Sequence, residues 1–67
     1  MLPGSAAMGA EPMRVLIADD EPLARERLRA MLLAQPGVEV VAEAGDGHAA
    51  LHACAKHHPD MILLDIS

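Results

Sequence analysis

Acidic side chains stand at the ends of two apolar segments. The stretch "VLIADDEP" begins at Val15 and places Asp19 and Asp20 directly after an apolar run, and "MILLD" ends in the same way at Asp65. Carboxylate oxygens are ligands that Mg²⁺ prefers, and a carboxylate beside the metal can attack a phosphoryl group to form an acyl phosphate. These aspartates therefore predict metal-assisted phosphoryl transfer, provided that the fold brings them together.

The apolar runs are predicted to be strands that alternate with helices. The segment 13–19 is short and rich in β-branched and other apolar side chains, which is typical of a parallel strand buried on both faces. Residues 21–37 change to helical spacing, with Pro22 in the first turn and Pro36-Gly37 at the end. A strand over 38–44, a helix over 48–58 and a strand over 61–65 follow. The order β-α-β-α-β predicts an α/β fold with a parallel sheet.

Helical and strand spacing also predict which side chains face the core. The first helix should bury one apolar stripe and leave its arginines on the other faces. The second helix should turn three small or apolar residues inward. The second strand should bury alternate positions. These inward sets are Ala24, Leu28, Met31 and Leu32; Ala50, Leu51 and Cys54; and Val38, Val40 and Ala42. Asp20 or Glu21 is expected to cap the first helix.

The strand order decides whether the aspartates meet. If the second and third strands flank the first, in the order 2-1-3, ligands would bind beyond the strand ends between the first and third strands. Asp19, Asp20 and Asp65 would then lie at one crevice, where a divalent cation would relieve their mutual repulsion. Asp65 stands alone at its strand end and is the better nucleophile, whereas Asp19 and Asp20 are the better metal ligands. An isolated acidic pair is explained equally well as a helix cap, so the prediction rests on the combination.

Composition excludes several classes of protein. The chain has 67 residues and a formal net charge of −5, which argues against a surface that grips nucleic acid. Cys54 is the single cysteine, so no internal disulfide can form and a reducing compartment is expected. No apolar run is long enough to span a membrane, and residues 1–12 lack a secretory signal. We expect a cytoplasmic protein with a disordered leader over 1–12 and one domain over 13–67.

Three stretches together resemble a known family. "VLIADDEPLARERL", "VAEAGDGHAAL" and "PDMILLDI" closely resemble the N-terminal half of the receiver domain of two-component response regulators, in the CheY-like superfamily. The resemblance covers residues 13–67 and implies a partial flavodoxin-like, doubly wound parallel sheet that is truncated after strand three. The wording of "DDEPLARERL" is most similar to regulators that carry a LytTR-type DNA-binding output.

The resemblance also implies roles for individual residues. It makes Asp65 the phosphoacceptor, and it makes Asp19, Asp20, Asp65 and the backbone carbonyl of Ser67 a Mg²⁺ site. The implied phosphoryl donor is a phosphohistidine on a sensor histidine kinase or a phosphotransfer protein. Control of transcription would follow through a DNA-binding output that these 67 residues do not contain.

Departures from the family leave two alternatives open. The later strands of a receiver, with their Ser/Thr and Lys partners for the phosphoryl group, do not occur in these residues. We therefore expect the chain alone to be a weak phosphoacceptor, with an exposed strand edge that can self-associate. One alternative is a fragment of a Mg²⁺-dependent phosphohydrolase-like enzyme, although such enzymes usually carry D-x-D on the first strand and this chain has adjacent aspartates. The other is an interaction piece that pairs with a full receiver.

Overall fold

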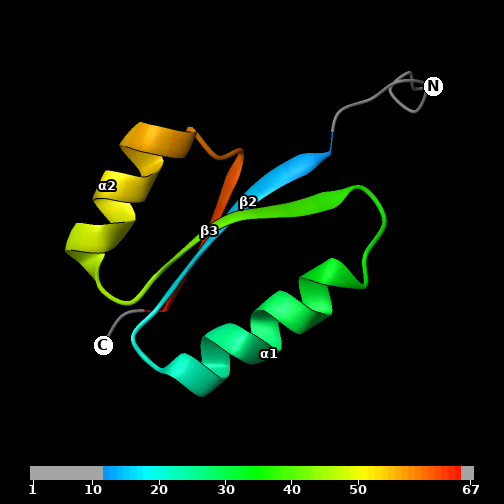
Figure 1. Cartoon of the computed structure of the whole chain (residues 1–67), viewed down its shortest axis with the longest axis horizontal. Coiled ribbons are helices and arrows are strands. Elements are labelled where there is room, and N and C mark those ends of the chain that lie inside the picture. The colour runs from blue at the N-terminus through cyan, green and yellow to red at the C-terminus, as the bar shows by residue number, and fades with distance from the viewer. Residues whose placement is uncertain (1–11, 66–67) are drawn as a thin grey trace.

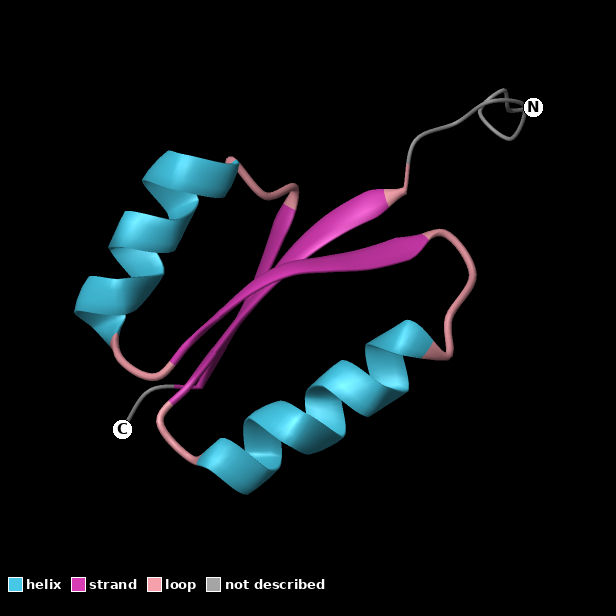
Figure 2. Ribbon diagram, in the orientation of Figure 1, coloured by secondary structure: helices cyan, strands magenta, loops and turns pink. Residues whose placement is uncertain are grey.

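A three-stranded parallel sheet carries the fold of the computed structural model, which describes residues 12–65. The elements are β2 (Met13–Asp19), α1 (Pro22–Leu33), β3 (Val38–Ala44), α2 (Gly47–His57) and β4 (Met61–Asp65). The strand order is β3-β2-β4, which confirms the predicted order 2-1-3. Figures 1 and 2 show α1 and α2 on opposite sides of the sheet. Ser67 and most of the predicted leader lie outside the described residues.

The central strand β2 supplies most of the buried apolar surface. Val15, Leu16, Ile17 and Ala18 are each 1% exposed or less, as expected for a strand covered on both faces. On the α2 side, Leu16 and Ala18 cluster with the buried alanines Ala44, Ala50 and Ala53. The small side chains at this contact let α2 approach the sheet closely. Because β2 is buried on both faces, its position is well defined up to Asp19, where the aspartates begin.

A break in the register changes the faces of β3. Val15 pairs with Val40, but the next residue, Leu16, pairs with Ala42, so Val41 is an extra residue on β3. Such a bulge reverses the alternation of side chains beyond it. Ala42 consequently packs against the cluster under α2, whereas Val40 shares the face of Val15. The prediction that Val40 and Ala42 share one side is wrong for this reason.

Two predictions about the helix faces are also wrong. Met31 is 64% exposed and Leu51 is 72% exposed, although Ala24, Leu28 and Leu32 are half-buried as predicted. Both helices pack on β2 and β3, and within residues 12–65 neither packs on β4. Met31 lies beside the half-buried stripe of α1, and Leu51 lies beyond the strands that α2 covers. Ala53 takes the inward position on α2 instead.

Acidic caps begin both helices. Glu21 is the N-cap of α1, where its Oε1 accepts a hydrogen bond from the Ala24 amide at 3.3 Å, which confirms the predicted acidic cap. Asp46 caps α2 and accepts from the Ala49 amide at 2.7 Å. The helices have 12 and 11 residues. Neither of these two helices has the length and apolar character that crossing a membrane requires.

Candidate functional site

Asp19 and Asp65 end neighbouring strands at the same level of the sheet. β2 and β4 run parallel, and their register pairs Val15 with Met61 at one end and Asp19 with Asp65 at the other. Register partners on parallel strands project from the same face and lie about 4.8 Å apart across the sheet. Asp20 follows Asp19 directly in the chain. The strand order thus brings the carboxyl ends of β2 and β4 to one edge of the sheet.

Asp19 is buried at this edge and is held from two directions. It is 3% exposed, the only charged residue among those described that is buried. Its side-chain Oδ1 accepts a hydrogen bond from the Glu21 amide at 2.8 Å, and its backbone carbonyl accepts one from Arg25 Nη1 at 2.7 Å. A buried carboxylate requires such partners, because burial removes the water that would otherwise solvate its charge. The position of Asp19 is therefore set by the start of α1, through the Glu21 amide and the Arg25 side chain.

Asp20 and Asp65 are exposed, in contrast to Asp19. Within residues 12–65, no three His, Cys, Asp or Glu side chains converge closely enough to form a metal site by themselves. Mg²⁺, however, usually retains several waters and takes only one or two protein carboxylates. The register pair Asp19 and Asp65 offers two carboxylates, which are the kind and number of protein ligands that Mg²⁺ usually takes.

Two arginines join α1 to β3 through Glu43, which the sequence analysis did not predict. Arg25 Nε lies 3.9 Å from Glu43 Oε1, and Arg29 Nε lies 3.2 Å from Glu43 Oε2. The side chain of Arg25 is 24% exposed and that of Arg29 is 48% exposed. Arginines on a surface helix are usually solvated, so helical spacing alone assigned them to polar faces. Arg25 also contacts Asp19 across the turn and the first helical turn, and sequence spacing alone does not show this contact because it depends on the angle at which α1 leaves β2.

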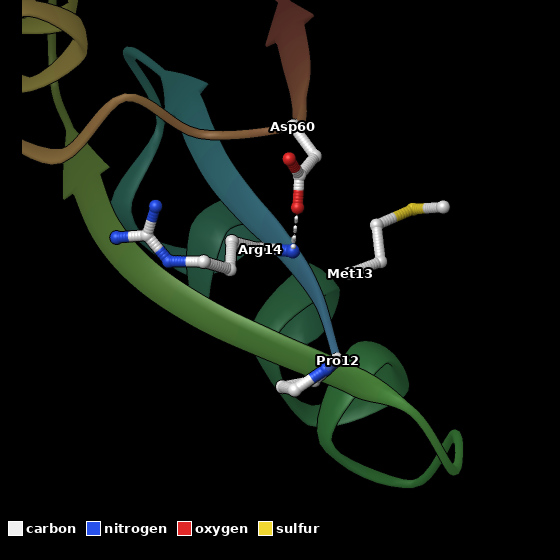
Figure 3. Close-up of a pocket in the computed structure, with 4 residues that line it drawn as sticks. All are labelled: Pro12, Met13, Arg14 and Asp60. Atoms are coloured by element: carbon white, nitrogen blue, oxygen red, sulfur yellow. Dashed lines mark hydrogen bonds between the residues drawn. The ribbon is translucent and has the colours of Figure 1, made fainter. Parts of the chain in front are cut away.

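A surface pocket lies at the opposite end of β2, where hydrogen bonds join β2 to the start of β4. Pro12, Met13, Arg14 and Asp60 line it. Figure 3 shows the Asp60 carboxylate directed at the Arg14 backbone, where the Arg14 amide donates to Oδ2 at 2.9 Å. The Asp60 amide donates in return to the Arg14 carbonyl at 2.8 Å, and Arg14 Nη1 donates to the His58 carbonyl at 3.0 Å. These bonds fasten the start of β4 to β2.

The strand-end aspartates and the sheet order agree with a known family. Residues 15–67 match the family model of the response regulator receiver domain. This chain belongs to the response-regulator receiver family, as the motifs predicted. Receiver domains are signalling modules, and the names of the relatives below support a place in two-component signalling.

Individual relatives are similar over most of this chain. NarP, a nitrate/nitrite response regulator of Escherichia coli, is 48% identical over 58 residues, which are 87% of this chain and 27% of NarP. The transcriptional regulatory protein PdtaR of Mycobacterium tuberculosis is 45% identical over 96% of this chain and 31% of that protein. A protein-glutamate methylesterase/protein-glutamine glutaminase of Anaeromyxobacter dehalogenans is 45% identical over 97% of this chain and 18% of the enzyme. The chain thus spans less than a third of each of these relatives.

A solved structure shares the arrangement of strands and helices. The signal receiver domain of NarL from Mycobacterium tuberculosis superposes with a TM-score of 0.79 at 47% sequence identity. The match covers 82% of this chain and 44% of that chain. It confirms a CheY-like α/β fold over the described strands and helices.

Proposed function

We propose that this chain is a phosphoacceptor module in which Asp65 accepts a phosphoryl group. A carboxylate oxygen of Asp65 would attack phosphorus and form an acyl phosphate. The bond from phosphorus to the donor nitrogen would break, and that nitrogen would take up a proton. The donor is a phosphohistidine on a sensor histidine kinase or a phosphotransfer protein. The observation that carries this proposal is that Asp65 is exposed and is also the register partner of the buried Asp19.

Mg²⁺ is the proposed cofactor, held by Asp19, Asp20, Asp65 and the backbone carbonyl of Ser67. The oxygen donors at the ends of β2 and β4 support the carboxylate part of this set. Ser67 lies outside the described residues, so its part rests on the resemblance of the sequence. When bound, the ion would neutralise charge on the phosphoryl oxygens. The buried Asp19 would contribute an orientation already fixed by its bond from the Glu21 amide.

The wider activity is proposed from the relatives. Names such as nitrate/nitrite response regulator and transcriptional regulatory protein support control of transcription, which would run through a DNA-binding output in the parent protein. The resemblance of "DDEPLARERL" to LytTR-type regulators supports an output of that type. The family match favours a signalling module over the phosphohydrolase alternative, and we propose no enzymatic activity beyond phosphotransfer and dephosphorylation at Asp65. The single cysteine supports a cytoplasmic location.

A polypeptide of these 67 residues is proposed to be a weak phosphoacceptor on its own. Phosphoryl transfer is accelerated by cations that stabilise the charge on the transferred group. In the part of the chain that the structure describes, both ion pairs involve Glu43, and neither supplies a cation to Asp65. Asp65 would therefore depend on Mg²⁺ alone for this stabilisation.

Self-association through β4 is a second proposed property. β4 pairs with β2 on one side, and no other strand of the three pairs with it. Ile62 is 44% exposed and Leu64 is 65% exposed, and both line an apolar groove against Leu51 of α2. An apolar edge strand without a lysine or proline is a template for another strand. A second copy presents the same edge, so we expect β4 to pair with β4.

A phosphorylation assay tests the main proposal. The chain is incubated with acetyl phosphate and Mg²⁺, and intact-protein mass spectrometry follows the gain of a phosphoryl group. We expect slow labelling of the wild type, no labelling of Asp65→Asn, and wild-type labelling of the control Asp60→Asn. The control changes an aspartate at the opposite end of the sheet and keeps an oxygen that can accept from the Arg14 amide. Labelling that persists in Asp65→Asn would refute the assignment.

A further inference from the structure

Arg25 reaches from α1 to the backbone of the acidic strand end. It lies on the first turn of the helix, and side chains of helical residues lean toward the helix N-terminus. Its Nη1 donates a hydrogen bond to the Asp19 carbonyl at 2.7 Å. That carbonyl belongs to the peptide that joins Asp19 to Asp20. The bond therefore fixes the orientation of the Asp19–Asp20 peptide plane, which directs the Asp20 side chain.

The guanidinium is itself held in place by β3 and the turn after it. Arg25 Nε lies 3.9 Å from Glu43 Oε1, and Glu43 is drawn toward α1 by its shorter contact with Arg29. Gly45 leaves room for the guanidinium, because a Cβ at that position would lie 3.2 Å from Arg25 Nη1. At 24% exposed, the Arg25 side chain is more enclosed than a solvated surface arginine would be. Three elements thus converge on one cation.

We infer that Arg25 is a positioning residue for the acidic site and sets the geometry of the Asp19–Asp20 peptide for Mg²⁺. This inference rests on the proposed function, because it takes the strand-end aspartates as the metal site. Arginine suits the task because its planar, permanently charged group donates in several fixed directions. One edge of the guanidinium donates from Nη1 to the Asp19 carbonyl, and Nε on another edge lies beside Glu43. Groups that orient metal ligands from behind commonly change metal affinity by about tenfold or more when they are removed.

Arg29→Gln provides the matched control for Arg25→Gln. Both variants remove one positive charge from α1 and one partner of Glu43, but only Arg25 contacts the Asp19 carbonyl. Mg²⁺ affinity is measured on the full chain by following amide signals in proton–nitrogen NMR. We expect Arg25→Gln to weaken Mg²⁺ binding about tenfold, Arg25→Lys to fall between it and the wild type, and Arg29→Gln to stay near the wild type. Equal losses in Arg25→Gln and Arg29→Gln would overturn the inference.

A second readout separates this inference from the proposed function. The Glu21 amide donates to Asp19 Oδ1, so its hydrogen exchange without metal reports the order of the turn. We expect faster exchange at Glu21 in Arg25→Gln than in Arg29→Gln. If the amide signals of the wild type do not change with Mg²⁺, the metal site is refuted. The comparison of hydrogen exchange at Glu21 would then still test the positioning role of Arg25. Equal exchange in the two variants would overturn it.

Two glycine variants test the positioning role of Arg25 while keeping the arginine itself. They decide the question if Arg25→Gln does not fold. Gly45→Ala places a Cβ against the guanidinium, whereas Gly47→Ala meets nothing within 4 Å. We expect Gly45→Ala to speed exchange at the Glu21 amide and to weaken Mg²⁺ binding severalfold. Gly47→Ala should change neither quantity. Identical behaviour of the two alanine variants would contradict a positioning role for Arg25.

Discussion

Asp19 and Asp65 are register partners on adjacent parallel strands, yet one is buried and the other is exposed. Asp19 is 3% exposed and is fixed by the Glu21 amide, so its carboxylate is oriented before any ligand arrives. Asp65 faces solvent, where a phosphoryl donor can reach it. This difference agrees with the proposed roles, in which Asp19 is a preorganised metal ligand and Asp65 is the accessible nucleophile.

Replacing Asp19 by Asn should separate metal binding from stability. The amide oxygen of Asn can still accept from the Glu21 N–H, but the negative charge is lost. We expect Mg²⁺ affinity to fall about tenfold or more, by analogy with lost metal-site groups. The free energy of unfolding should stay unchanged or rise by about 1 kcal/mol, because a buried charge has been removed. Metal titration by NMR and urea unfolding measure the two effects, and wild-type Mg²⁺ affinity in this variant would contradict the metal role.

The two helix caps should differ in strength. Asp46→Ala removes a 2.7 Å hydrogen bond to the Ala49 amide, and Glu21→Ala removes a 3.3 Å bond to the Ala24 amide. We expect Asp46→Ala to lower the free energy of unfolding by about 1 kcal/mol. Glu21→Ala should cost less, because the longer bond is weaker. The chain has no aromatic residue, so far-ultraviolet circular dichroism is the measurement of choice. A larger loss in Glu21→Ala would contradict the ranking.

Local sequence patterns were sufficient to predict the elements and their order. The run 13–19 coincides with β2, 38–44 with β3 and 61–65 with β4, because each apolar run is bounded by acids, glycine or proline. The strand order followed from the resemblance and from the rules for parallel sheets. The edge shared by Asp19 and Asp65 then follows from the strand order together with the parallel pairing of β2 and β4.

Features that depend on packing between elements could not be predicted in this way. Single-strand alternation contains no sign of the bulge at Val41, because the bulge is a property of the pairing between β2 and β3. The exposure of Leu51 depends on which strands α2 covers, and helical periodicity gives no such information. The contact of Arg25 with the Asp19 carbonyl requires the angle at which α1 leaves β2. The roles of Asp19, Asp20, Asp65 and Ser67 remain predictions.

The buried centre of β2 should dominate stability. Leu16 is 0% exposed and packs in the cluster beneath α2, whereas Leu51 on α2 is 72% exposed. Leu16→Ala should lower the free energy of unfolding by about 3 kcal/mol, which combines lost burial with a cavity. The control Leu51→Ala removes the same atoms from an exposed position and should change stability by about 0.5 kcal/mol or less. Comparable losses in urea unfolding of the two variants would contradict the assignment of the core.

Charge placed on β4 should suppress self-association of the chain. Leu64 on the β4 edge and Met31 on α1 are 65% and 64% exposed, so a lysine at either position meets a similar amount of solvent. A lysine on an edge strand opposes strand pairing because pairing would bury its charge or bring two like charges together. We expect sedimentation velocity to show concentration-dependent association for the wild type and for Met31→Lys, and a monomer for Leu64→Lys. Association that survives in Leu64→Lys, or that disappears equally in Met31→Lys, would show that the β4 edge is not the contact.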